Sequence, residues 1–177
     1  AEIDFLVGGA YAFFRYTGIE RHTCDFDIFV REQDCKKILK LLSSKNKCRA
    51  ELSFPHWLGK VYWEMLYIDV IFSSGNGVAR VDDDWFNYAT EDSVLGVPVK
   101  LIPAEEMIWS KGFIMERERF DGADIAHVIH ARGEQLDWNR LVKRYKDNWQ
   151  VLLSHLLLFT FIYPAEAGKI PDTVMND

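Results

Sequence analysis

Several features that would place a sequence in a familiar class are scarce among these 177 residues. There are three cysteines, Cys24, Cys35 and Cys48, and no two of them have a Cys-x-x-Cys spacing. An odd count without that spacing argues against a disulfide framework and against a cysteine-rich zinc site. The sequence therefore fits a reducing, cytoplasmic setting.

The sequence also lacks a long hydrophobic run. Its most apolar stretch, residues 151–163, is interrupted by Ser154 and His155, and a membrane-spanning helix needs about 20 apolar residues. We therefore expect a buried helix there and no membrane partner. No secretory signal is visible. The chain has no initiator Met and leads at once into an apolar segment, so we expect that its natural N-terminus is incomplete and that an early helix is missing.

Basic residues are in deficit, because 21 Lys and Arg face 27 Asp and Glu and give a formal net charge of −6. Proteins that coat nucleic acid need an excess of positive charge. The charge therefore argues against a broad nucleic-acid-coating surface, whereas a narrow basic groove is compatible with these numbers. A hydrophobic content of 49% with 14% aromatic residues is typical of a globular protein with a core.

The residue pattern predicts an α+β protein, with a mixed β-sheet core flanked by helices and then a C-terminal helical region. Strands are expected at 5–7, 26–30, 50–54, 61–66 and 67–72, with a small hairpin or edge strand at 95–101. Helices are expected at 10–16, closed by Thr17-Gly18, and at 35–42 with Asp34 as the N-cap. Further helices are expected at 103–119, at 121–131, up to residue 145 with Asp137 as the cap, and at 151–163. Residues 43–47 read as a polar turn. We therefore divide the chain into an α/β core, residues 1–102, and a helical region, residues 103–177, that packs on it.

Three features of the first half carry candidate chemistry. Gly8-Gly9 follows a short strand and precedes a helix, where glycines let backbone N–H groups approach a phosphate. Asp25 and Asp27 are two residues apart at the start of a strand, so their side chains point to the same face. Asp69 lies within an apolar strand, where an unpartnered carboxylate is costly. A shared Mg²⁺ or Mn²⁺ ion would satisfy all three carboxylates.

Each of these features also has an ordinary structural interpretation. A Gly-Gly pair is more often only a turn, and a single Asp can be a helix cap, a turn residue or half of a salt bridge. The combination in this order is much less expected by chance than any one member.

The stretch from Phe5 to Val30 resembles the signature of the DNA polymerase beta-like nucleotidyltransferase superfamily, in which a glycine pair after a strand is followed by an Asp-x-Asp strand. Asp69 matches the third carboxylate of that signature. The lead-in that contains Arg21 and Thr23 is similar to the form seen in AbiEii-type toxins and related bacterial proteins. Gly8-Gly9 stands where Gly-Ser is commoner.

A second segment resembles AbiEii-type proteins less specifically. There a helical lysine precedes an Arg-rich turn and an Asp-x-x-Asp helix start. The matching residues here are Lys111, Arg117, Arg119, Asp121 and Asp124. The resemblance implies that this group contacts the nucleotide, with Lys111 reaching the triphosphate. Its alternative is a solvated lysine beside a charge-laced helix end. Asp124, His127 and His130 are spaced three apart on one helix and could instead form a separate metal face.

The resemblance implies a nucleotidyltransferase that uses two metal ions, Mg²⁺ or Mn²⁺, to move a nucleoside monophosphate from an NTP to a hydroxyl. Asp25, Asp27 and Asp69 would hold the metal and act in catalysis, and Gly8, Gly9, Arg21 and Thr23 would help to bind the nucleotide. The acceptor, an RNA end, a protein or a small molecule, stays open, as does a partner protein in a toxin–antitoxin pair. Three alternatives remain: a nucleotide-binding module without turnover, a structural or interaction protein with its acids in salt bridges, and a hydrolase that uses water as the acceptor.

Overall fold

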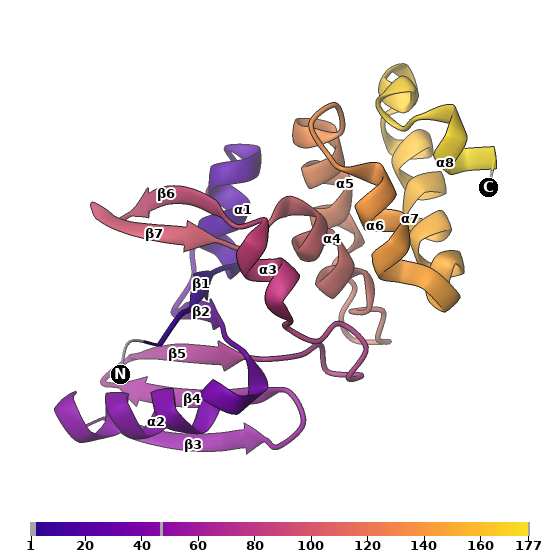
Figure 1. Ribbon diagram of the computed structural model, residues 1–177. Coiled ribbons are helices and arrows are strands. Elements are labelled where there is room, and N and C mark those ends of the chain that lie inside the picture. Colours follow the sequence, from indigo (N-terminus) through magenta and orange to yellow (C-terminus); the bar gives the residue numbers. More distant parts are fainter. Residues whose placement is uncertain (1–2, 47, 177) are drawn as a thin grey trace. The chain divides into compact units, whose positions relative to one another are not determined.

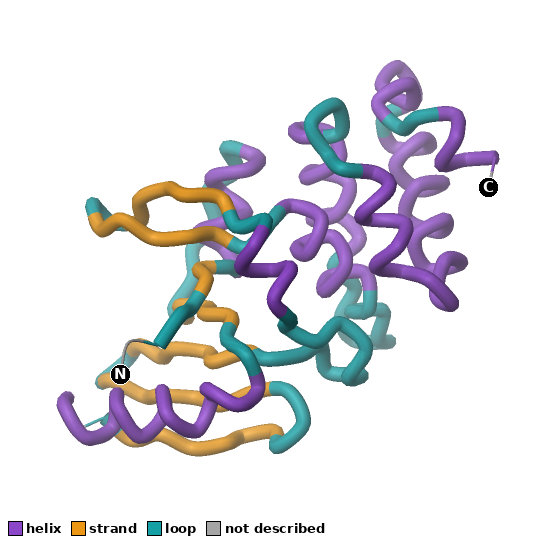
Figure 2. Tube along the Cα trace, in the orientation of Figure 1, coloured by secondary structure: helices purple, strands orange, loops and turns teal. Residues whose placement is uncertain are grey.

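The computed structural model describes residues 3–46 and 48–176. The chain forms two compact units, with the boundary between Pro103 and Ala104. Within the described residues, the named strands all belong to the first unit, whereas the second consists of helices and loops (Figure 2). The α+β class is confirmed by this arrangement.

The first unit is built on one mixed sheet (Figure 1). Within the described residues the sheet has seven strands in the order β3-β4-β5-β2-β1-β7-β6. The strands are β1 Leu6–Val7, β2 Asp25–Phe29, β3 Arg49–Phe54, β4 Leu58–Trp63, β5 Leu66–Ile71, β6 Thr90–Val94 and β7 Val97–Leu101. Its helices are α1 Gly9–Thr17, α2 Glu32–Asn46 and α3 Asp83–Asn87.

The centre of this sheet is the parallel pair β2 and β5, with Asp27 opposite Asp69 and Ile28 opposite Val70. Alternation along each strand sends Ile28 and Val70 to one face, where they pack in a core with Cys35 and Leu39 of α2. The aspartates consequently point to the other face.

The hairpin expected at 95–101 is present as β6 and β7, which turn at Leu95 and Gly96 with positive φ at both. Its edge strand is β6, because β7 also pairs with β1 through Val7 and Leu101. Pro98 pairs with Ser93 on the β6 side, beyond the short register that β7 shares with β1. The missing N–H of Pro98 is therefore compatible with its place in the sheet.

Two local predictions around α2 are wrong. The helix begins at Glu32 rather than at Cys35, so Asp34 lies inside the first turn and not at the N-cap. There its carboxylate binds Lys37 at 2.7 Å. The helix also continues to Asn46 through most of the turn expected at 43–47, of which residue 47 lies outside the described residues. Packing of the apolar face of α2 on the sheet outweighs the weak helix propensity of the two serines.

The second unit contains α4 Ala104–Gly112, α5 Gly122–Arg132, α6 Trp138–Tyr145, α7 Trp149–Ile162 and α8 Asp172–Asn176, with 3-10 turns at Lys146–Asn148 and Pro164–Lys169. Ile108, Ile125, Leu141 and Phe159, from four of these helices, are fully buried. Asp137 caps α6 as expected, because its side chain accepts a hydrogen bond from the Arg140 N–H. No helix of the described residues is long and apolar enough to cross a membrane.

The helix expected at 103–119 is too long. In the structure α4 ends at Gly112, and a short antiparallel bridge joins Met115 to Phe120. The Tyr145 hydroxyl occupies the space that a side chain at Gly112 would need, and it donates a hydrogen bond to the Ile108 carbonyl. After α4 the chain turns back, so that the Asp121 N–H donates to the Ile114 carbonyl at 3.1 Å and the Asp121 carboxylate binds Lys111 of α4.

Candidate metal and nucleotide site

Asp25, Asp27 and Asp69 converge on the sheet face that points away from α2. One carboxylate oxygen from each residue lies within 4.8 Å of the others. The convergence follows from strand geometry, since Asp25 and Asp27 are two residues apart and Asp69 is the register partner of Asp27. Among the described residues this is the only group of three or more His, Cys, Asp or Glu side chains close enough to share an ion. A donor set of carboxylate oxygens fits Mg²⁺ or Mn²⁺.

The Gly8-Gly9 turn closes one side of this carboxylate cluster. The Gly8 N–H donates to the Asp27 carbonyl at 3.0 Å, and Gly9 has a φ of +52°. A Cβ at Gly9 would collide with the Asp27 carboxylate. The turn is thus a close approach that requires glycine, and it places the N-terminus of α1 beside the acids. The first turn of α1 contains no acidic residue, so its partial positive charge is available to an anion.

Thr23 and Arg21 lie in the loop just before β2. The Thr23 hydroxyl hydrogen-bonds the Asp25 carboxylate, and the Asp25 N–H lies 3.4 Å from the same hydroxyl oxygen. This contact orients one of the three candidate ligands. The Arg21 guanidinium lies over the Phe13 ring of α1, 4.3 Å from its centroid.

Lys60 is the residue of this cluster that the sequence analysis missed. Its ammonium lies 2.7 Å from Oδ1 of Asp69, and both side chains are largely buried. Burial lowers the pKa of Lys60, but the hydrogen bond and the attraction of Asp69 outweigh it, so the pKa is raised. The pairing depends on a tight turn after Trp63, which sets Lys60 opposite Asp69. The sequence analysis expected a single strand at 61–66, which would run through that turn. It therefore did not indicate that Lys60 lies opposite Asp69.

A pocket of about 760 Å³ opens beside Thr23. It is bounded by α1, by residues 20–23 and by the β6–β7 turn. Tyr11 and Phe14 contribute aromatic rings to its lining, Arg15 and Arg21 guanidinium groups, and His22 an imidazole. Arg15 is held by Asp92 at 2.7 Å. None of the three aspartates lines this pocket, but Thr23 both lines it and contacts Asp25.

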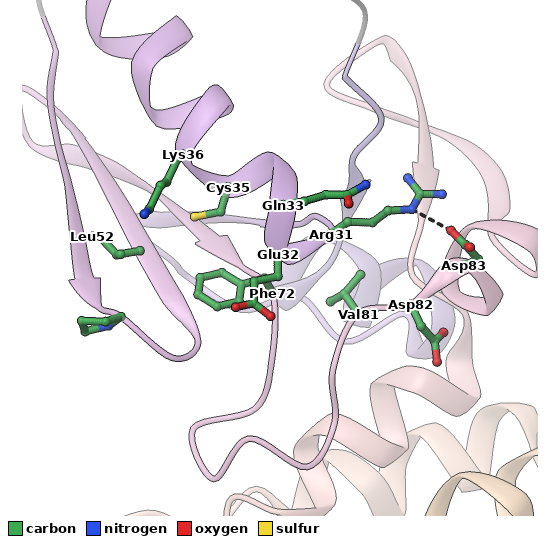
Figure 3. Close-up of a pocket in the computed structure, with 11 residues that line it drawn as sticks. Arg31, Glu32, Gln33, Cys35, Lys36, Leu52, Phe72, Val81, Asp82 and Asp83 are labelled. Carbon is green, nitrogen blue, oxygen red and sulfur yellow. Dashed lines mark hydrogen bonds and ion pairs between the residues drawn. The ribbon is translucent and has the colours of Figure 1, made fainter.

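A second pocket, of about 820 Å³, lies at the start of α2 (Figure 3). None of the three aspartates is among its lining residues. Arg31 binds Asp83 at 2.7 Å at its margin, and the apolar wall is formed by Leu52 and Phe72. Its lining mixes acidic and basic side chains, so it favours neither an anionic nor a cationic ligand.

The predicted residues of the second unit form an ion cluster of their own. The Lys111 ammonium lies 2.8 Å from both Asp121 and Asp124, and Arg119 lies 3.1 Å from Asp121. Burial raises the pKa of Asp121, but the two cations outweigh this and lower it. Lys111 is therefore not a solvated lysine on a helix surface. Its contact with a triphosphate stays a prediction.

The metal face considered for Asp124, His127 and His130 is not formed. Asp124 binds Lys111, while Nδ1 of His127 lies 3.1 Å from the Tyr163 hydroxyl. His130 stacks on Tyr163 and approaches Glu166 at 3.1 Å. Asp124 is thus paired with Lys111, and the two histidines both contact Tyr163, as in ordinary packing and hydrogen bonding.

Comparison with solved structures identifies the fold. The antibiotic-resistance factor ANT(2'')-Ia matches with a TM-score of 0.58 over 86% of this chain and 87% of its own, at 13% identity. An antigenic nucleotidyltransferase-like protein from Paracoccidioides brasiliensis matches with a TM-score of 0.57 over 99% of this chain and 89% of its own, at 15% identity. No protein-family model and no curated protein matches the sequence. The chain therefore shares the fold of these two proteins, which agrees with the fold that the sequence resemblance implied.

Proposed function

We propose that this protein is a divalent-metal-dependent nucleotidyltransferase that moves a nucleoside monophosphate from an NTP to a hydroxyl acceptor and releases pyrophosphate. The observation that carries the proposal is the convergence of Asp25, Asp27 and Asp69 within 4.8 Å beside the Gly8-Gly9 turn. The fold shared with two nucleotidyltransferase-like structures supports it.

The chain supplies groups for each part of such a transfer. Asp25 and Asp27 would hold the cation that neutralises the triphosphate, and Asp69 would complete a second cation site. A bound divalent cation supplies charge stabilisation as the phosphoryl group is transferred. Asp69 would also accept the proton of the attacking hydroxyl. The N-terminus of α1, brought close by Gly9, would face the phosphates.

The pocket beside Thr23 suits the rest of the nucleotide. The rings of Tyr11 and Phe14 offer surfaces for a nucleobase to stack on, and Arg21 and His22 offer donors to phosphate oxygens. In this proposal Lys111, Arg119, Asp121 and Asp124 keep their predicted nucleotide-binding role, with the two aspartates orienting the lysine.

The acceptor is proposed at the level of class only. One structural neighbour is described as an antibiotic-resistance factor with substrate-regulated conformation dynamics, which favours testing small hydroxylated molecules first. The net charge of −6 weighs against a large RNA. A protein side chain is the remaining acceptor class.

Calorimetric titration of the four NTPs with Mg²⁺ tests the site. We expect metal-dependent binding by the wild type and loss of binding in Asp25→Asn/Asp27→Asn. The matched control is Asp4→Asn/Asp83→Asn, which removes two exposed carboxylates near Arg31 and should bind like the wild type. Binding that the double substitution at 25 and 27 leaves intact would contradict the proposal.

Turnover is measured separately as pyrophosphate release in the presence of pooled hydroxyl acceptors. NTP binding with no release from any acceptor class would favour a nucleotide-binding module without turnover. Release that proceeds without an acceptor would indicate that water takes its place and that the protein is a hydrolase.

A further inference from the structure

Lys60 projects from β4 on the face of the sheet that carries the three aspartates. It is the register partner of Asp69 in the antiparallel pair β4 and β5, and its ammonium lies 2.7 Å from Oδ1 of Asp69. The Lys60 side chain is 23% exposed and the Asp69 side chain is 13% exposed. The contact is therefore held within the sheet and is shielded from solvent, unlike a surface ion pair.

The ring of Tyr67 also contacts the Lys60 ammonium. The ammonium lies over the Tyr67 ring, 4.8 Å from its centroid, and Tyr67 is two residues from Asp69 on the same face of β5. Tyr62 is two residues from Lys60 on β4, and its hydroxyl donates to Glu51 at 2.8 Å. Cation–π attraction to Tyr67 thus adds to the ion pair between Lys60 and Asp69.

The contact with Lys60 changes the net charge of the carboxylate cluster. Three carboxylates within 4.8 Å repel one another, and one ammonium reduces their summed charge from −3 to −2. A divalent cation on the same carboxylates would share Asp69 with the ammonium, and the two positive charges would repel each other. Lys60 and the cation therefore compete for Asp69.

We propose that Lys60 is a positioning residue that acts as the resident counter-ion of Asp69 and weakens cation binding at the nucleotide-free cluster. It holds the Asp69 carboxylate oriented while no cation is bound. It also keeps the affinity low enough that the cluster fills readily only when a triphosphate adds its own negative charge. This inference rests on the proposed metal site.

Titration with Mn²⁺ alone tests the proposal, with free Mn²⁺ measured by its electron paramagnetic resonance signal. We expect Lys60→Met to bind Mn²⁺ about tenfold more tightly than the wild type, because a like charge close to the cation is removed in a partly buried site. Lys60→Arg retains the charge and should bind nearly as the wild type does. Lys40→Met, which removes a charge from an exposed position on α2, should change nothing.

The direction of the change separates the two roles that Lys60 could have. A lysine needed only for structure would lose Mn²⁺ affinity when it is replaced, so equal or weaker binding by Lys60→Met overturns the proposal. Lys60→Gln provides a second neutral side chain, and thermal unfolding shows which variants are folded. If neither the wild type nor Lys60→Met binds Mn²⁺ better than Asp25→Asn/Asp27→Asn does, the metal site itself is refuted. If the wild type binds Mn²⁺ and Lys60→Met binds it with the same affinity, only the proposed role of Lys60 is refuted.

Discussion

Gly9 and Gly18, at the two ends of α1, both have left-handed backbone conformations, with φ of +52° and +73°. Their surroundings differ. A Cβ at Gly18 would meet no atom within 4 Å, whereas one at Gly9 would collide with the carboxylate of Asp27. Gly18 is thus required only by the helix C-cap, and Gly9 is required both by the backbone and by the candidate site.

This pair separates backbone strain from damage to the site. We expect Gly18→Ala to cost roughly 1–2 kcal/mol of stability from left-handed strain alone and to leave Mn²⁺ binding unchanged. Gly9→Ala should carry a similar strain and also displace Asp27, so its Mn²⁺ affinity should fall more than tenfold. Chemical denaturation and the same Mn²⁺ titration measure both effects. Equal Mn²⁺ affinity in the two variants would show that Gly9 has no special relation to the site.

Single residues also show how far the sequence could define the site. The spacing of Asp25 and Asp27 dictates a shared face, and the structure places them on one face beside Asp69. Lys60 could not be found in the same way, because its relation to Asp69 depends on the register of the β4–β5 hairpin. A shift by one residue sends a side chain to the opposite face, so a misplaced turn conceals the contact completely.

At the level of elements, α4 and α6 are joined by a buried group of charges. Glu106 is fully buried, and Arg140 lies 2.5 Å and Arg144 3.0 Å from it. Glu105 also binds Arg140, and its second oxygen accepts a hydrogen bond from the Asp137 N–H at 2.7 Å. Burial raises the pKa of Glu106, although both arginines oppose this. The ionised carboxylate therefore depends on its partners.

Removal of Arg140 should destabilise the second unit strongly. We expect Arg140→Met to cost about 3–5 kcal/mol, because two mostly buried carboxylates lose their shared cation. The matched control is Arg117→Met, since Arg117 and Glu118 are 92% and 70% exposed, and it should cost less than about 1 kcal/mol. Urea denaturation followed by circular dichroism measures both. Similar costs for the two substitutions would contradict the importance given to burial.

The helices and strands also show which structural features sequence patterns could predict. Apolar alternation located the central strands, and Thr17-Gly18 and Asp137 marked helix ends because their signals act within one turn of the chain. The end of α4 was missed, since it depends on Tyr145, more than 30 residues away, and on the ion pairs of Asp121 with Lys111 and Arg119. Contacts distant in sequence override helix propensity there.

At the scale of the whole molecule, each unit has its own buried side chains and its own ion pairs, so each responds to pH through different groups. In the first unit Arg15 lowers the pKa of Asp92, and in the second Lys111 and Arg119 lower that of Asp121 against the effect of burial. Such carboxylates stabilise the fold at neutral pH, and this contribution is lost as pH falls through their folded pKa. Acid should therefore weaken both units.

His155 should make the second unit lose stability at a milder pH than these carboxylates do. Its side chain is buried in α7, and burial lowers its pKa below 6.5 despite the hydrogen bond to the Gly112 carbonyl. The unfolded chain then binds the proton more readily, so the stabilisation is complete above about pH 6.5 and declines as pH falls below it. The loss should approach about 1 kcal/mol per pH unit below that point.

His155→Gln isolates this contribution, because glutamine can donate to the Gly112 carbonyl but does not titrate. Urea denaturation of the wild type at pH 7.5, 6.5 and 5.5 should show falling stability, and the slope should be smaller in His155→Gln. His22→Gln is the control, since His22 is exposed in the loop before β2, and its slope should match that of the wild type. The same slope in all three proteins would mean that His155 binds its proton as readily in the folded protein as in the unfolded chain. That would require a rearrangement of α7 around it.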